Sequence, residues 1–483
     1  MSDYYQLSRE IAHLSSAYTL VHWDFETQMP KGTAEWRGET MSFFAGLLHE
    51  KTSSASYLAA AESAHAAATD PVEKEALRKA VRDIKKRTLV PQKLVEELTE
   101  ATARAHGAWQ KAKKENNYAE FAPHLETIIR LTKEQARCIA EGKDPYDALL
   151  EEFSPGMSSA TVSALFGELR PKLQALIEKR RPAHGLSWSV PVAVQEKICH
   201  DVIDWMKFPR EFLTAARSVH PFCTSLHPSD VRITTRYDEN DPLMSLLSTV
   251  HELGHALYER QLPTQAPGTP LAQANGMDLH ESQSRLWEVC LATSPAFYRW
   301  VHAWYQQHAP EHLGALSADD LFRMGSEVKP SLIRTESDPV SYGMHIMIRF
   351  ELERAIFDGK LGVQELPAAW ASAYEKYLGV MPRTLAEGVL QDSHWPGGAF
   401  GYFPSYLLGT MIACQLFEAM EKEFPDLMAR VERGDVAPFQ QWLAAKVHRY
   451  GRGKDTQDIL LAATGKKLET APFLNFLQAR FFA

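Results

Sequence analysis

The sequence predicts a mainly α-helical protein with one short β region. Over most of the 483 residues, apolar side chains recur at the spacing of an amphipathic helix. The only stretch with the two-residue period of a half-buried strand lies between Ser218 and Tyr237, where Val231 and Ile233 alternate with polar or charged residues. No repeat, low-complexity tract or long linker divides the chain, so we expect a single domain over residues 1–483.

The expected helices follow the apolar periodicity and the turn signals between them. Ahead of the β region they cover residues 4–25, 33–51, 53–68, 71–88, 91–115, 158–180, 192–205 and 210–216. Breaks fall at Lys143-Asp144-Pro145 and at Ser154-Pro155-Gly156, and Ser158 or Ser159 is the expected cap of the helix that follows. Behind the β region the pattern returns over residues 273–292, 296–308, 317–322, 342–358, 366–378, 406–424 and 436–450.

Composition excludes several classes of protein. The net charge of -9 gives no electrostatic reason to expect a nucleic acid or an anionic membrane as partner. Five scattered cysteines without CxxC spacing argue against a disulfide framework and against a thiolate metal site. The polar, amphipathic N-terminus shows no secretory signal, and no apolar run reaches the roughly 18 residues of a membrane span. We therefore expect a cytoplasmic protein.

The segment His251-Glu252-Leu253-Gly254-His255 is the strongest chemical signal. On a helix, residues four apart share one face, so both imidazoles can bind one metal ion. Glu252 can then act as general base on a metal-bound water. Asp241 and Pro242 stand where an N-cap and a first-turn proline belong, and Pro263 ends the segment. The alternative is that both histidines are hydrogen-bonded groups of a buried helix.

A hydrolytic zinc site usually has three protein ligands, so a third must be found. The segment 280–288 reads as part of a second helix, and an antiparallel helix returning past the first can bring a carboxylate to the same ion. Glu281, Glu288 and Asp278 are the acidic candidates. Spacing alone does not choose among them, and each has the alternative of facing solvent.

The chain resembles the Taq-type metallocarboxypeptidases, which are zinc or cobalt enzymes that remove single residues from peptide C-termini. The resemblance covers the chain from about residue 5 to its end. It rests on motifs in the order of the family: the opening from Trp23-Asp24 to Met29-Pro30, D-x-R-x-T at 230–234, HExxH at 251–255, HES-Q at 280–283, I-R-x-x-A-D at 333–338 and G-x-x-Q-D-x-H-W at 388–395. Ser337 stands where the family usually has alanine.

The resemblance implies specific roles and a specific fold. It places the metal ligands at His251, His255 and Glu281, and the general base at Glu252. It also implies one saddle-shaped helical fold divided by a long central groove, in which the helices of about residues 1–150 form a groove wall or lid. A homodimer, one divalent ion per chain (Zn²⁺, or alternatively Co²⁺), peptide substrates with a free C-terminus, and broad specificity with poor cleavage next to proline are further implications.

Oxyanion donors and a carboxylate receptor must complete such a site. His394, Tyr402 and Tyr406 flank a glycine-containing stretch, 397–401, that we interpret as a mobile loop closing on substrate; their alternative role is packing. For the substrate carboxylate, Arg334 is the first candidate and Arg349 the second.

Two further residues near these candidates have open roles. Asp338 is a candidate structural partner of Arg334. Arg232 either lines the groove or pairs with Asp230, and the edge of its strand is a candidate for pairing with extended peptide.

Two competing functions remain open at this stage. A related helical zinc oligopeptidase or dipeptidyl carboxypeptidase would share HExxH and a distant glutamate. A metal-stabilised scaffold without catalysis would share the histidines, although it would have no use for Glu252.

Overall fold

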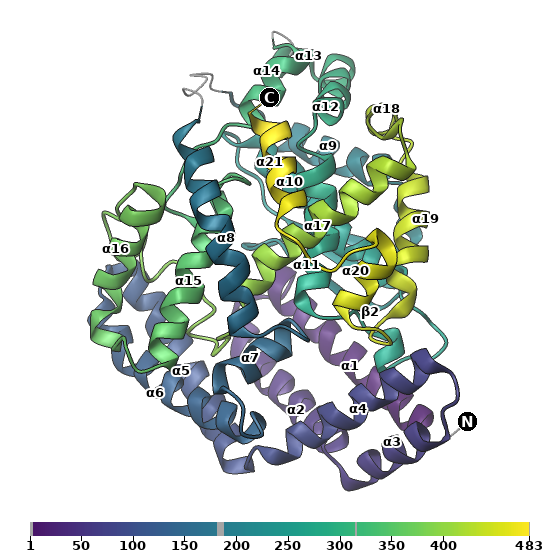
Figure 1. Cartoon of the computed structure of the whole chain (residues 1–483), viewed down its shortest axis with the longest axis vertical. Helices are drawn as coiled ribbons and strands as arrows, with labels where there is room; N and C mark the ends of the chain where they lie inside the picture. Colours follow the sequence, from purple (N-terminus) through teal and green to yellow (C-terminus); the bar gives the residue numbers. More distant parts are fainter. Residues whose placement is uncertain (1–2, 181–187, 314–315, 483) are drawn as a thin grey trace.

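The structure is a computed structural model that describes residues 3–180, 188–313 and 316–482. It is mainly α-helical, with a small sheet near the centre of the chain, as predicted (Figure 1). The N-terminal helices are α1 Asp3–Thr27, α2 Ala34–Thr52, α3 Ala55–Ala67, α4 Pro71–Leu89, α5 Gln92–Glu115, α6 Tyr118–Ile139, α7 Pro145–Phe153, α8 Ser159–Glu178 and α9 Val192–Trp205. Of these, α6 and α7 are absent from the helices that the sequence predicts.

The later helices carry the HExxH and HES-Q segments. They are α10 Pro242–Arg260, α11 Met277–Arg285, α12 Pro295–His308, α13 Pro310–Leu313, α14 Ala318–Gly325, α15 Tyr342–Phe357, α16 Leu366–Leu378, α17 Pro404–Glu423, α18 Leu427–Arg433, α19 Ala437–Lys446, α20 Thr456–Thr464 and α21 Ala471–Phe481. The helices α13, α18, α20 and α21 are absent from the helices that the sequence predicts. Among the described residues, no helix is both long enough and apolar enough to span a membrane.

The sheet has three strands in the order β1-β3-β2: β1 Leu213–Arg217, β2 Cys223–His227 and β3 Asp230–Thr235. β1 runs parallel to β3 and β2 runs antiparallel to it. The predicted helix 210–216 is wrong: a 3₁₀ turn, Arg210–Phe212, leads into β1. Because Leu213 to Arg217 pair with Val231 to Thr235, backbone bonds to a distant strand override the local helical pattern.

The position of β3 also corrects the expected peptide-pairing edge. β3 lies between its two neighbours, so both of its edges are already hydrogen-bonded and cannot receive a peptide. Val231 and Ile233 are buried on β3, and α10 packs against this strand. Of the two outer strands, β2 contacts both α1 and α10.

Local capping fixes where the HExxH helix begins. The Asp241 side chain accepts a hydrogen bond from the Met244 backbone N–H at 3.2 Å, and Pro242 occupies the first turn, as predicted. The predicted helix 273–292 begins four residues late, at Met277, because Pro270–Ala272 forms a 3₁₀ turn. Its second half, Leu286–Leu291, is a π-helix, a form that often occurs at functional sites.

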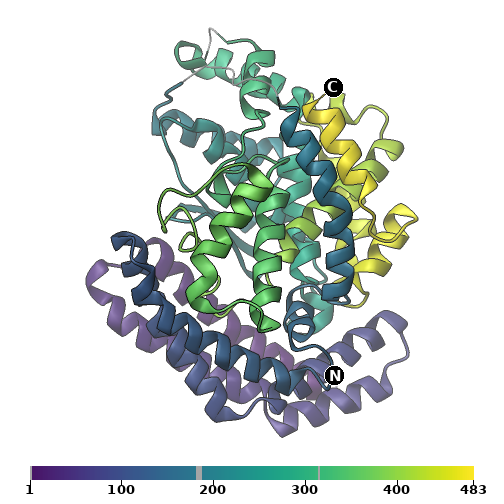
Figure 2. The same cartoon turned by 60° about the vertical axis from the view of Figure 1, so that its left-hand side comes forward.

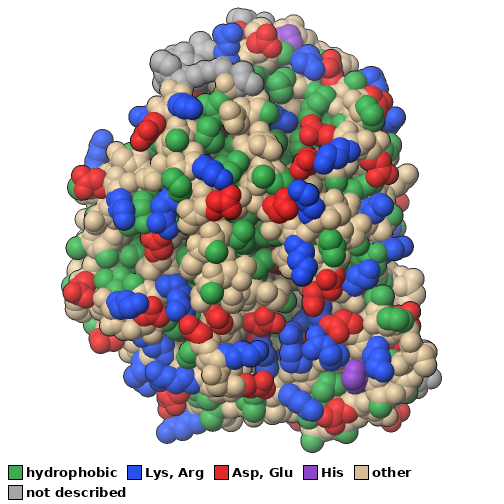
Figure 3. Space-filling view, viewed as in Figure 1, with side chains coloured by type: hydrophobic (Ala, Val, Ile, Leu, Met, Phe, Trp, Pro, Cys, Tyr) green, Lys and Arg blue, Asp and Glu red, His purple; other side chains and the backbone are tan. Residues whose placement is uncertain are grey.

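The N-terminal helices form a layer of their own. Figure 2 shows α1 to α6, in purple and blue, along one side of the molecule, with the remaining helices packed on the other side of this layer. Two hydrogen bonds tie α5 to the segment between α16 and α17: Trp109 Nε1 donates to the Leu390 carbonyl at 2.9 Å and Lys113 Nζ donates to the Gln391 carbonyl at 3.0 Å. Acidic and basic side chains are mixed over the face in Figure 3.

Candidate metal centre

His251, His255 and Glu281 converge on one point between α10 and α11. Their ligand atoms lie within 4.8 Å of one another. Glu281 Oε2 is 3.8 Å from His251 Nε2 and 3.4 Å from His255 Nε2. The helical spacing of four puts both imidazoles on one side of α10, and α11 brings the carboxylate to them.

Two glycines allow the close approach of the helices that carry the group. A Cβ at Gly254 would lie 2.7 Å from the Gln283 carbonyl oxygen, so α11 packs directly on the backbone of α10. A Cβ at Gly409 would lie 2.7 Å from the Cβ of Glu281, so α17 packs equally close to α11. Any larger residue at either position would push the Glu281 carboxylate away from the histidines.

Outer contacts orient both imidazoles. His251 Nδ1 donates to Glu288 Oε2 at 2.8 Å, so Nε2 is the ring nitrogen that faces Glu281. His280 Nε2 lies 2.9 Å from Glu259 Oε1, and His280 Nδ1 lies 2.6 Å from His255 Nδ1. Since the carboxylate must accept, His280 donates from Nε2; with its Nδ1 as acceptor it binds the Nδ1–H tautomer of His255.

These residues fit a divalent ion. Zinc binds imidazole nitrogen at about 2.0–2.1 Å and carboxylate oxygen at about 2.0–2.2 Å, so ligand atoms 3.4 and 3.8 Å apart span one ion. Of the three acidic candidates, Glu288 is occupied by His251 and Arg285, and Asp278 is fully buried outside the group. The geometry therefore favours Glu281 as the third ligand.

The titratable groups of the centre shift one another's pKa. Burial raises the pKa of Glu252, which is only 6% exposed, to about 7. Burial alone would lower the pKa of His251, but the Glu281, Glu288 and Glu252 carboxylates together raise it to about 9. Burial lowers the pKa of His255 to about 4. A carboxyl group with a pKa near 7 both accepts and releases a proton at neutral pH.

His394, Tyr402 and Tyr406 form a second polar group. His394 Nε2 and Tyr406 Oη are 3.1 Å apart, and the Tyr402 ring centroid lies 5.3 Å from that of His394. Burial lowers the pKa of His394 to about 3 and raises that of Tyr402 to about 12, so both are neutral near pH 7. Tyr406 lies in the first turn of α17, one turn before Gly409 and its contact with Glu281.

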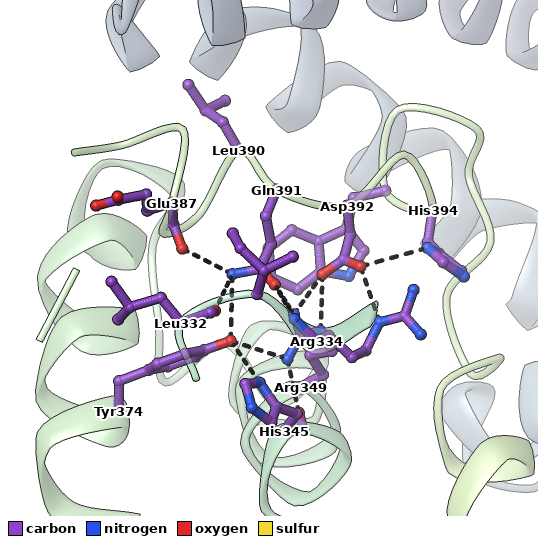
Figure 4. Close-up of polar contacts among 12 residues, drawn as sticks. Leu332, Arg334, His345, Arg349, Tyr374, Glu387, Leu390, Gln391, Asp392 and His394 are labelled. Carbon is purple, nitrogen blue, oxygen red and sulfur yellow. Dashed lines mark hydrogen bonds and ion pairs between the residues drawn. The ribbon is translucent and has the colours of Figure 1, made fainter. Parts of the chain in front are cut away.

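The two arginine candidates share one carboxylate, Asp392, as Figure 4 shows. Arg334 Nε donates to Asp392 Oδ1 at 3.0 Å, and Arg349 Nε donates to Asp392 Oδ2 at 2.7 Å. Arg349 is fully buried, whereas Arg334 lies against the Tyr406 ring at 4.8 Å. Arg334 is thus the one of the two that borders the polar group around His394.

Asp338 and Arg232 each bind groups close to them in the sequence. Asp338 is not the partner of Arg334. Its carboxylate instead accepts hydrogen bonds from the Val340 and Ser341 backbone N–H groups at the start of α15. Arg232 pairs with Asp230 through Nε and Nη2, both at 2.9 Å, and its guanidinium lies 5.6 Å from the Trp23 ring.

Four residues of the site had not been predicted as functional: His280, Glu259, Asp392 and Glu353. His280 and Asp392 lie inside motifs that the sequence displays, HES-Q and Q-D-x-H-W, which is a signal for them. Glu259 and Glu353 lie on regular helices with no local mark. Their roles depend on contacts with residues far away in the sequence.

Comparison with known proteins places the chain in a family. A family model described as carboxypeptidase Taq (M32) metallopeptidase matches residues 3–481. Carboxypeptidase 1 of Bacillus subtilis is 34% identical over 99% of this chain and 97% of its own length. Thermostable carboxypeptidase 1 of Thermus thermophilus is 35% identical over the same shares.

Solved structures agree with this placement. The carboxypeptidase of Pyrococcus furiosus has a TM-score of 0.96 at 31% identity, with 99% of this chain and 98% of that chain covered. The M32 carboxypeptidase of Deinococcus radiodurans has a TM-score of 0.95 at 33% identity, with coverage of 99% and 97%.

The mainly helical fold and the His-His-Glu group together define a helical metallopeptidase. The match covers nearly the whole length of this chain and of each relative. The chain belongs to the Taq-type (M32) metallocarboxypeptidase family, whose members are peptide hydrolases.

Proposed function

We propose that this enzyme removes single amino acids from the free C-terminus of peptides, with broad specificity. The observation that carries the proposal is Arg334. Its guanidinium borders the Tyr406 ring at 4.8 Å, and Tyr406 in turn contacts His394 at 3.1 Å. A cation whose planar fork matches a carboxylate, next to neutral donors, suits a chain end rather than an internal peptide bond.

The residues of this chain divide the work as follows. Glu252 accepts the proton of the attacking water and delivers it to the leaving amine, a role that suits its pKa of about 7. His394, Tyr402 and Tyr406 are neutral donors that stabilise the negative charge on the carbonyl oxygen. Arg334 holds the terminal carboxylate, which sets the bond that is attacked.

A divalent ion would be held by His251, His255 and Glu281. When bound, it supplies a Lewis acid that polarises the scissile carbonyl and makes water more acidic. Two neutral imidazoles and one carboxylate leave the ion with one net positive charge, which suits Zn²⁺, with Co²⁺ as the alternative.

Arg349 and Arg232 serve this proposal indirectly. Arg349 is fully buried and bound to Asp392, so we assign it to support of Arg334. Arg232 is engaged by Asp230 and borders Trp23, a residue of α1, which suits a place on the wall of a substrate groove. An extended peptide would pair with β2, the outer strand that contacts α10.

The proposal extends to cell location and assembly. We propose that the enzyme acts in the cytoplasm as a homodimer on soluble peptides, with the helices of about residues 1–150 as one groove wall or lid. The mixed surface charges in Figure 3 and the net charge of -9 favour neither nucleic acid nor membrane as a partner.

The test compares one peptide with a free and with an amidated C-terminus, and identifies the products by mass. We expect a ladder of single-residue losses from the free form only. Internal cleavage or loss of dipeptides would support the alternative, a helical zinc oligopeptidase or dipeptidyl carboxypeptidase.

Substitution of Arg334 sharpens this test. Arg334→Ala is expected to lower kcat/KM for the free form by about 100-fold, the value of a strong hydrogen bond to a charged group. Arg299→Ala, which removes an exposed ion pair with Glu432, is the control. An equal effect of Arg334→Ala on the free and amidated peptides would rule out carboxylate recognition by this residue.

A further inference from the structure

We infer that Asp392 is a positioning residue that, backed by Arg349, presents the guanidinium of Arg334 to the carboxylate of the substrate. The inference rests on the proposed role of Arg334 and deepens it. It explains why the chain buries two arginines around one aspartate, and it assigns each arginine a different task.

Asp392 connects the two arginines through different oxygens. Its side chain is 8% exposed. Oδ1 accepts from Arg334 Nε at 3.0 Å, while Oδ2 accepts from Arg349 Nε at 2.7 Å and lies 2.6 Å from Arg349 Nη2 in an ion pair. Figure 4 shows the carboxylate between the two guanidinium groups. The contact with Arg349 uses two nitrogens, whereas the contact with Arg334 uses only one.

Arg349 has no donor left for a ligand. Besides Asp392, its Nη1 donates to the His345 carbonyl at 2.8 Å and to Tyr374 Oη at 3.3 Å, and its Nη2 donates to Gln391 Oε1 at 2.7 Å. Because its side chain is 0% exposed, substrate cannot reach it. Arg349 therefore acts as the fixed counter-charge that holds Asp392 in place.

Arg334 keeps its outer edge free. Its Nη1 makes one long contact of 3.3 Å with Tyr342 Oη, and within the described part of the chain its Nη2 has no hydrogen bond to protein. A guanidinium held at Nε still presents the Nη1–Nη2 pair, the fork that binds both oxygens of a carboxylate. Asp392 thus binds Nε of Arg334 and leaves the Nη1–Nη2 pair for the substrate.

The charges around the Nη1–Nη2 pair of Arg334 favour the binding of an anion. Burial lowers the pKa of His345 and His394 and raises the pKa of Tyr342, so these neighbours are neutral near pH 7. Two guanidinium groups against one carboxylate leave one positive charge, and no described neighbour that contacts Arg334 neutralises it. Lys113, near Asp392, adds further positive charge. A bound carboxylate would complete the balance of a buried cluster.

The experiment uses Asp392→Asn in the metal-loaded enzyme. Asparagine has one oxygen, so its NH₂ group must face one of the two guanidinium groups, donor against donor. For each variant we would measure KM of a free-acid peptide and the inhibition constant of the same peptide amidated. The ratio of the second to the first reports recognition of the carboxylate. We expect Asp392→Asn to lower this ratio by about 10-fold to 100-fold, with a smaller change in kcat.

Asp338→Asn is the matched control. Asp338 is a half-buried aspartate four residues from Arg334 that caps α15 and does not touch this arginine. The Asp338→Asn variant is expected to be less stable but to keep the native ratio of inhibition constant to KM. Should Asp392→Asn fail to fold, Asp392→Glu keeps the charge but moves the carboxylate by one methylene, and the ratio is still expected to fall.

A double-mutant cycle separates the inference from the proposed function. In an Arg334→Ala background, Asp392→Asn is expected to leave the ratio unchanged, because its effect passes through Arg334. A folded Asp392 variant with the ratio of the native enzyme would overturn the inference while leaving carboxylate recognition intact. If Arg334→Ala itself leaves the ratio unchanged, the proposed role of Arg334 fails instead.

Discussion

His280 Nδ1 lies 2.6 Å from His255 Nδ1, and this contact determines which nitrogen of His255 carries the proton. Glu259, one turn after His255 on α10, accepts from His280 Nε2 at 2.9 Å. His280 Nε2–H donates to the carboxylate, and His255 Nδ1–H donates to His280 Nδ1. The Nε2 lone pair of His255 is therefore left for a metal ion. Glu259 thus orients His255 through His280, whereas Glu288 orients His251 directly.

Removal of His280 is expected to weaken metal binding without removing a ligand. His280→Ala leaves His255 free to rotate and to change tautomer, and outer residues of this kind typically contribute 10-fold to 100-fold in metal affinity. Titration with a competing chelator measures the change in Kd for Zn²⁺. His308→Ala, an exposed histidine at the end of α12, is the control. Unchanged metal affinity in His280→Ala would show that His255 needs no such support.

The carboxylates Glu281 and Glu288 are expected to differ in what they cost the metal site. Glu281→Ala removes a proposed ligand and should abolish stoichiometric metal binding. Glu288→Ala removes no proposed ligand, only the acceptor of His251 Nδ1–H and of Arg285 Nη1, so the loss of metal affinity should stay near 10-fold to 100-fold. Metal content after dialysis, followed by chelator titration, ranks the two variants. The reverse order would make Glu288 the third ligand.

Glu252 is expected to be needed for turnover and not for metal binding. Glu252→Gln keeps the size of the side chain and removes the base, which typically contributes 10²-fold to 10⁴-fold to the rate. The His-His-Glu group does not include Glu252, so metal content should remain near one ion per chain. Hydrolysis of a free-acid peptide by the metal-loaded variant provides the measurement. Activity near that of the native enzyme would exclude Glu252 as the base.

Local patterns made some of these features predictable and left others out of reach. The HExxH helix could be predicted with its cap, because Asp241 and the residues it binds are neighbours in the sequence. β1 could not, since a five-residue strand exists only through its pairing with β3. Local spacing suggests Asp338, four residues away, as the partner of Arg334, while the actual partner, Asp392, lies 58 residues away.

The same distinction applies inside the candidate site. The family motifs contain the proposed metal ligands, and the structure brings His251, His255 and Glu281 together. The residues that orient them follow from packing: His280 reaches His255 because α11 lies directly on Gly254. No periodicity in the sequence encodes such a contact. The residues that orient the proposed ligands can therefore be identified only from the packing of the helices.

Glu353 on α15 anchors the segment that leads to α17. It is fully buried and accepts hydrogen bonds from Trp395 Nε1 at 2.8 Å, the Gly401 backbone N–H at 2.9 Å and Tyr146 Oη at 2.8 Å. Burial outweighs these donors and raises its pKa to about 7. In the unfolded chain a glutamate titrates near 4.3. The folded state therefore binds this proton more tightly, and its contribution to stability is lost as pH rises from about 4 to about 7.

Glu353→Gln is accordingly expected to flatten part of the pH dependence of stability. An uncharged amide does not titrate, so the difference in free energy of unfolding between pH 5 and pH 8 should become less steep by roughly 2–3 kcal/mol. Urea unfolding at both pH values measures this difference, even if the amide lowers stability at every pH by losing one acceptor. Glu351→Gln, on the same helix but paired with Arg170 nearer the surface, is the control. If Glu353→Gln shifts both values equally, then Glu353 is charged in the folded protein across this range, and its three donors rather than its burial set its protonation.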